Sequence, residues 1–303
     1  MRLLQKIKLS HLMISIVLII IGGQQAEAQL TTFHSMYFEN EYLANPAMAG
    51  LQKGLNIDLG YQQQWTNVPG APKLQNATAD YNAGNNVGLG INVNADQAGL
   101  ISTTRVMATY AYHLPLNGNN SKLNFGLSFG INDTYIDYNK IVGDAGDVEA
   151  TNFNNQGVYV DGDLGISYTS STLTVQGAVP NVRSVFFPKA GEDLDVDRST
   201  FFTAASYKFI PDNESNSITI EPKVAFRGIK GFDNILDAGA NLDMTQYGFN
   251  ISSMYHTNKT ITFGVGLNLF QTDLLFAYTN NTGSLGSYVN NTFEFGVKLK
   301  LFK

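Results

Sequence analysis

The chain has no cysteine among its 303 residues. Disulfide bonds and thiol chemistry are therefore excluded, and so is the acylated first cysteine of a bacterial lipoprotein. Charge is also sparse, because Asp, Glu, Lys and Arg make up 15% of the residues and the formal net charge is −6. A weakly acidic chain of this kind lacks the basic surface that binds nucleic acid, so no nucleic-acid partner is expected.

Histidine is scarce as well, with 4 in the whole chain. Enzymatic barrels need a nucleophile held beside a base, usually Ser or Thr with His and an acid. His34 precedes the strands, while His113 and His256 end strands on opposite sides of the expected topology. No catalytic pair is therefore expected, and the sequence indicates a protein that is not an enzyme.

Only one long hydrophobic run is present, and it lies near the N-terminus at Leu12–Ile21, after three basic residues. A run of about ten apolar residues is half of what spans a bilayer. Ala26 and Ala28 supply the small residues that a signal peptidase reads, so cleavage is expected after Ala28. The chain is thus predicted to be exported, with residues 1–28 as signal peptide.

Alternation with a period of two is abundant. One segment presents an apolar set, interleaved with Asn, Gly and Ser, at Leu123, Phe125, Leu127, Phe129 and Ile131. The same pattern runs from Val87 to Val93 and from Ile261 to Leu269. A soluble sandwich would carry richly charged outer faces. Strands of about ten residues with one apolar and one small polar face instead predict a wall between lipid and a polar lumen.

About fourteen such segments can be counted, an even number that lets an antiparallel barrel close with both termini in the periplasm. They are expected at 54–65, 73–81, 86–94, 103–113, 121–133, 157–169, 172–180, 199–209, 216–228, 234–244, 247–256, 259–269, 272–280 and 290–302. The sequence therefore predicts an all-β transmembrane barrel over 54–303. A short periplasmic or lumenal segment, 29–53, separates it from the signal peptide.

The predicted outside loop 181–198 carries two candidate sites. Carboxylates suited to calcium occur at Glu192, Asp193, Asp195 and Asp197, although their spacing is not that of an EF-hand and a solvated acidic loop is the alternative. Beside them lie Phe186, Phe187 and Pro188. Exposed aromatic residues rimmed by charge indicate a protein interface, unless the loop folds into its own barrel mouth.

The stretch "YFENEYLANPAMAGL", from Tyr37 to Leu51, precedes the first strand. Asn45-Pro46 favours an extended residue followed by a rigid turn, and Gly50 supplies free dihedral angles. Tyr37, Tyr42 and Leu43 are apolar enough to plug or edge the base of the lumen. We expect this segment to lead the chain from the periplasm into the barrel wall.

The chain resembles the PorP/SprF family of type IX secretion membrane proteins. The matching motifs are "NPAMAG" at 45–50, "YQQQWTNVPGAPKLQNATAD" at 61–80, "NVGLGINVNADQAGLISTTRVMATYAYHLPL" at 86–116 and "VPN" at 179–181. The resemblance covers the whole mature chain. The residues that match the family's motifs look structural rather than catalytic. These carried-over residues are Asn45, Pro46, Gly50, Trp65, Gly70, Ala71, Pro72, Gly88, Gly90, Gly99, Tyr110, Tyr112, Pro180 and Asn181.

The resemblance implies an outer-membrane barrel of type IX secretion in Bacteroidota. It also implies partners: the secretion machinery, a secreted cargo such as a surface adhesin, and for some members a periplasmic peptidoglycan-binding protein. No ATP or redox cofactor is expected. A docking or anchoring barrel is favoured because the lumen is too crowded to pass a folded adhesin. The alternative is a passive porin or small-solute channel.

Overall fold

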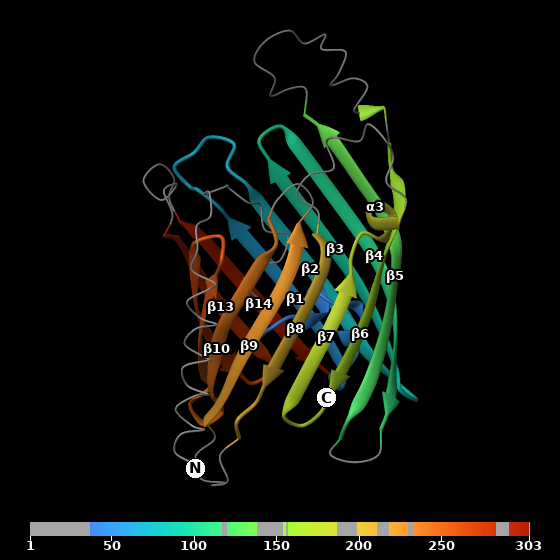
Figure 1. Cartoon of the computed structure of the whole chain (residues 1–303), viewed down its shortest axis with the longest axis vertical. Coiled ribbons are helices and arrows are strands. Elements are labelled where there is room, and N and C mark those ends of the chain that lie inside the picture. Colours follow the sequence, from blue (N-terminus) through green and yellow to red (C-terminus); the bar gives the residue numbers. More distant parts are fainter. Residues whose placement is uncertain are drawn as a thin grey trace, which may run out of the picture.

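The structure, a computed structural model, describes residues 37–116, 120–137, 154–155, 157–186, 199–210, 218–229, 233–282 and 291–302. Fourteen antiparallel strands, β1 to β14, form a closed barrel (Figure 1). Each strand pairs with its neighbours in the sequence, and β1 closes the ring by pairing with β14 from Leu55↔Leu301 to Gln63↔Phe293. The predicted all-β barrel of about fourteen strands is thereby confirmed.

The strands follow one another up and down the wall. They are β1 (Leu55–Gln63), β2 (Lys73–Gly84), β3 (Val87–Ala98), β4 (Ile101–Pro115), β5 (Lys122–Ile136), β6 (Tyr159–Thr169), β7 (Leu173–Val179), β8 (Ser199–Tyr207), β9 (Ile218–Ile229), β10 (Ile235–Met244), β11 (Phe249–His256), β12 (Thr260–Leu269), β13 (Thr272–Asn281) and β14 (Thr292–Leu301). A five-residue helix, α3 (Val182–Phe186), and three short 3-10 helices, η1 (Glu41–Leu43), η2 (Pro46–Met48) and η4 (Thr245–Tyr247), complete the described elements.

The two faces of the wall differ as the alternation predicts. On β5, Leu127 and Phe129 expose 55% and 64% of their surfaces outward, whereas Asn124 and Ser128 are buried in the lumen. The outer face is apolar because it meets lipid, and the inner face carries the polar groups of the chain. Among the described residues, no helix is long and apolar enough to cross a membrane.

All fourteen expected segments contain a strand, with shifted ends. β1 stops at Gln63 rather than at residue 65, because Trp65 has a left-handed backbone with φ 46°. β2 and β3 extend toward each other through a two-residue turn in which Asn85 and Asn86 both have positive φ, as tight hairpins require. β4 likewise extends to Pro115 while β5 begins at Lys122, one residue later than expected, so the connection expected at 113–121 is shorter.

The connections alternate between the two ends of the barrel. β1–β2, β3–β4, β5–β6, β7–β8, β9–β10, β11–β12 and β13–β14 join at one end, which we call the outer end; the expected topology places it outside the cell. At this end Gln64 N–H donates to the Pro72 carbonyl at 3.0 Å, and Gly99 N–H donates to the Gly70 carbonyl at 2.9 Å. The carried-over residues of 65–72 therefore lie in a turn that is bonded to the next outer turn.

Candidate functional site in the barrel lumen

The chain before β1 lies inside the barrel and fills part of its cross-section. We call Tyr37–Leu51 the plug. Its residues Tyr42, Ala47, Met48 and Ala49 are buried, and η2 packs against β4, β5 and β6. A segment without regular strands is thus enclosed by the wall, and its polar backbone and side chains need partners on the strands.

Two asparagines fold the plug locally. The Asn40 side chain accepts a hydrogen bond from Leu43 N–H at 3.2 Å, and Asn45 accepts one from Ala47 N–H at 3.0 Å. Pro46 occupies the first position of η2, where its missing N–H costs nothing. Gly50 adopts φ +67°, and its N–H donates to Asp80 on β2 at 2.9 Å. The Asn-Pro step and the glycine therefore form the compact turn that places the plug against the wall.

A charged cluster on β9, β10 and β11 anchors the start of the plug. The Tyr37 hydroxyl donates to Asp237 at 3.0 Å, while Arg227 donates to the same carboxylate at 2.8 Å. Lys223 donates to the Tyr37 carbonyl and to Glu41, each at 2.6 Å. Every one of these wall residues is buried, so each charge depends on its partners within the cluster and in the plug.

His256 belongs to the same cluster. Its Nδ1 lies 2.5 Å from Asp237, and its Nε2 lies 2.9 Å from the Thr262 hydroxyl. Carboxylate, imidazole and hydroxyl are the groups of a hydrolytic triad, a juxtaposition that the sequence analysis missed. Here Asp237 also holds Arg227 and Tyr37, the Tyr37 ring lies 6.0 Å from the imidazole, and Thr262 is buried. We interpret the arrangement as an anchor of the plug.

The opposite wall holds the middle and end of the plug. Tyr42 donates to the Thr109 hydroxyl on β4 at 2.7 Å, and Asn40 donates to Thr78 on β2 at 2.9 Å. Asn45 donates to Gln176 on β7 at 3.2 Å, and the Ala49 carbonyl lies 3.0 Å from His113 Nε2. The plug is therefore bonded to strands from both halves of the barrel.

Four wall glycines make room for the plug, namely Gly88 and Gly90 on β3, one glycine on β5 and one on β6. A Cβ atom at Gly126 on β5 would collide with backbone atoms of Pro46 and Ala47, and one at Gly165 on β6 would collide with the Asn45 side chain. The plug thus approaches the wall more closely than a side chain at these positions would allow. The sequence analysis carried over Gly88 and Gly90 as structural residues, but it did not identify Gly126 or Gly165 as contacts.

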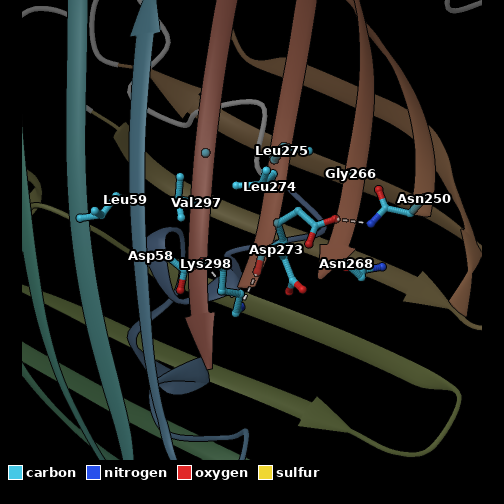
Figure 2. Close-up of a pocket in the computed structure, with 12 residues that line it drawn as sticks. Asp58, Leu59, Asn250, Gly266, Asn268, Asp273, Leu274, Leu275, Val297 and Lys298 are labelled. Atoms are coloured by element: carbon cyan, nitrogen blue, oxygen red, sulfur yellow. Dashed lines mark hydrogen bonds and ion pairs between the residues drawn. The ribbon is translucent and has the colours of Figure 1, made fainter. Parts of the chain in front are cut away.

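A small pocket remains between the plug and strands β1, β11, β12, β13 and β14 (Figure 2). Glu39 accepts a hydrogen bond from Asn250 at 3.0 Å, and Lys298 donates to the Glu39 carbonyl at 2.8 Å while pairing with Asp58 at 3.6 Å. Lys300 pairs with Asp273. Acids and lysines alternate around the pocket, and no group of metal-binding side chains was found among the described residues.

Burial shifts the acidity of the plug side chains. It raises the pKa of Glu39, an effect that the Lys298 ammonium opposes and the Asp273 carboxylate reinforces. It likewise raises the pKa of the Tyr42 phenol, so this hydroxyl stays protonated at neutral pH and can donate to Thr109. Of these groups, Glu39 can therefore change the charge of the plug, whereas the tyrosines remain neutral at neutral pH.

Apart from Gly88 and Gly90, which lie against the plug, the remaining predicted site residues are found elsewhere. Pro180 and Asn181 follow the end of β7, and Tyr110 and Tyr112 face outward on β4. Phe186 ends α3 and is 58% exposed. Phe187, Pro188 and the calcium candidates Glu192, Asp193, Asp195 and Asp197 lie outside the described residues, as does the signal peptide.

Comparison with solved structures finds similar chains at low sequence identity, among them an outer membrane protein and a porin. Omp33 of Acinetobacter baumannii matches with a TM-score of 0.46 and 9% identity over 83% of this chain and 100% of its own. CdiB of Acinetobacter baumannii gives 0.43 and 8% over 82% and 60%, and a Rhodopseudomonas blastica porin mutant gives 0.34 and 8% over 82% and 99%. No match was found among curated protein sequences.

One protein family matches nearly the whole chain. Its description is type IX secretion system membrane protein PorP/SprF, and the match runs over residues 26–299. The match spans both the plug and the barrel, so the two parts belong to one family pattern. The chain is a member of the PorP/SprF family of type IX secretion system membrane proteins, and its closed, lipid-facing barrel lies in the outer membrane.

Proposed function

We propose that this barrel is a docking or anchoring site at the outer membrane for a secreted protein, such as a surface adhesin, or for components of the secretion machinery. The observation that carries the proposal is the plug, which is hydrogen-bonded to strands around the lumen and occupies space that a solute would need. A plugged barrel can bind partners at its surfaces, but its interior is not open to the passage of solutes. The rival function is that of a passive porin, which requires the plug to leave the lumen.

Conductance separates the two functions. Gly126→Val is expected to convert a poorly conducting barrel into a conducting one, because the new side chain collides with the backbone of Pro46 and Ala47 and displaces the plug. Gly177→Val is the matched control, since a Cβ there meets only ordinary contacts at 3.8 Å. Planar-bilayer recordings on refolded barrels, checked for heat-modifiable migration on gels, provide the measurement. A wild-type barrel that conducts like a porin would favour the rival function.

Docking itself is tested at the exposed end of α3. Phe186→Ala combined with Phe187→Ala is expected to leave the barrel assembled but to reduce the cargo retained at the cell surface, because a buried aromatic anchor contributes on the order of 2 kcal/mol or more to binding. Phe263→Ala, a lipid-facing change on β12, serves as the control. Surface cargo is quantified on intact cells by antibody labelling. Unchanged retention in the double variant would place the partner elsewhere on the barrel.

A further inference from the structure

We propose that the barrel wall contains a slot for one additional β-strand, between β6 and β8 beyond the end of β7, and that an extended strand of the docked secreted protein fills it. The inference rests on the proposed docking function and names the surface that performs it. It follows from where the strand pairing stops, what stops it, and which backbone groups are left facing the gap.

Among the described residues, no strand lies between β6 and β8 on the outer side of β7. β7 pairs with β6 only from Thr169↔Thr174 to Leu164↔Val179, and with β8 only from Leu173↔Tyr207 to Ala178↔Phe202. Figure 1 shows β7 ending partway up the wall, with α3 above it. Beyond β7, β6 continues to Tyr159 and β8 to Ser199, each still paired with its other neighbour, β5 or β9. The gap is one strand wide, about 10 Å between β6 and β8, because β7 itself fills it below.

The end of β7 is specified by the Pro180-Asn181 pair. Pro180 has no N–H to donate to a continuing ladder, and Asn181 has a left-handed backbone with φ 53°. Asn181 N–H then donates to Asp163 at 3.0 Å, and Arg183 N–H donates to Asp161 at 3.1 Å. Since both carboxylates are buried on the lumenal face of β6, these bonds hold α3 behind the gap, where it closes the slot toward the lumen.

The chain that follows β7 does not suit the slot. On β7 the exposed Val175 points to lipid and the buried Gln176 points to the lumen, so odd-numbered residues face outward. A straight continuation would turn Asn181 and Arg183 toward lipid, where a charged side chain is strongly disfavoured. Residues 181–183 therefore do not continue β7 into the slot, and the proposed occupant comes from another chain.

The edge of β6 offers backbone groups to such an occupant. In the β6–β7 hairpin, Ser170 N–H donates to the Leu173 carbonyl at 2.8 Å, so even-numbered residues of β6 direct their backbone groups toward β7. By the same alternation Val160 and Gly162 direct theirs into the slot. The Gly162 N–H is held by the neighbouring Asp161 carboxylate at 2.7 Å, which covers this edge in the isolated barrel.

The slot defines the chemistry of its occupant. A strand that runs in the direction of β7 is antiparallel to both β6 and β8 and can form ladders on its two sides. Its outward residues would lie beside the exposed Val160, beyond the Leu164 that pairs with β7, so they must be apolar. Its inward residues would lie near Asp161, Asp163 and the Arg105 that pairs with them, so they must be polar. The partner is therefore a short segment of alternating apolar and polar residues.

Photocrosslinking in cells that secrete cargo tests the position. A p-benzoylphenylalanine at Val160 is expected to crosslink to a single alternating segment of a secreted protein, identified by mass spectrometry of the linked peptide. The same probe at Phe129 is the control, because Phe129 faces lipid on β5 opposite Gly162, one strand away from the slot. Adducts at Val160 to lipid alone, or to the barrel's own chain, would overturn the proposal.

A proline substitution tests the hydrogen bonding. Val160→Pro removes an N–H that faces the slot, whereas Val160→Thr keeps it, so only the proline variant is expected to lose cargo from the cell surface. If Val160→Pro does not assemble, the variant Pro180→Thr, Asn181→Val, Val182→Thr, Arg183→Val extends β7 into the slot and is expected to show the same loss. Retained cargo in an assembled variant of either kind overturns the slot. Retained cargo after deletion of the whole barrel would instead overturn the docking function.

Discussion

Replacing Asp237 with alanine is expected to lower the free energy of unfolding of the barrel by about 3–5 kcal/mol, the usual cost of breaking a buried ion pair from one side. Asp237 is fully buried and receives bonds from Arg227, Tyr37 and His256. Without the carboxylate, the buried Arg227 guanidinium keeps its charge but loses its partner. The plug loses an anchor in the same step.

Urea titration of the refolded barrel measures this loss, with the fluorescence of the single tryptophan, Trp65, as the signal. Asp243→Ala is the matched control on the same strand, because the Asp243 carboxylate accepts a bond from Thr245 at an exposed position. Replacing both partners, as Arg227→Met with Asp237→Leu, is expected to recover much of the stability, since no charge is then left unpaired. Equal losses for Asp237→Ala and Asp243→Ala would contradict the role of the cluster.

Val265→Arg is expected to cost about 2–4 kcal/mol, the penalty for a basic residue facing lipid near the bilayer midplane. Val265 lies in the middle of β12 and exposes 47% of its surface on the outer face. Asn268→Arg on the same strand is expected to cost far less, because Asn268 lines the lumenal pocket and pairs across to Asp273, a carboxylate that attracts the new charge.

The comparison is made by urea unfolding in lipid vesicles rather than in detergent, because only a bilayer imposes the penalty at a defined depth. A loss for Asn268→Arg as large as that for Val265→Arg would contradict the assignment of lipid and lumen faces on β12. The pair of variants thus tests the orientation of the wall independently of the plug.

The lipid-facing and lumenal sides of the wall could be predicted from the sequence, because each depends only on the alternation of neighbouring residues along a strand. On β5, Leu127 is at an odd-numbered position and Asn124 at an even-numbered one, and this alternation alone assigns Leu127 to lipid and Asn124 to the lumen. Strand ends were less predictable, since the left-handed backbone at Trp65 and the hairpin turn at Asn85-Asn86 depend on dihedral angles that alternation does not report.

The anchors of the plug could not be predicted in the same way. Tyr37 and Asp237 are separated by 200 positions, and no period or motif links a tyrosine before the barrel to one carboxylate among many in the wall. The turn residues Asn45, Pro46 and Gly50 were visible as turn formers, yet their neighbours on β2, β6 and β7 became apparent only in three dimensions. The end of β7 was predicted to within one residue, but the way the adjacent strands continue beyond it became apparent only from the strand pairing.

The plug contacts both the beginning and the end of the barrel, and this has a consequence for biogenesis. Gly50 bonds to Asp80 on β2, while the Glu39 carbonyl accepts from Lys298 on β14, a residue 259 positions away. An unfinished sheet that lacks its last strand cannot offer the full set of bonds. Docking of the plug and pairing of β1 with β14 therefore depend on each other, and we expect the plug to form all its bonds only once the barrel has closed.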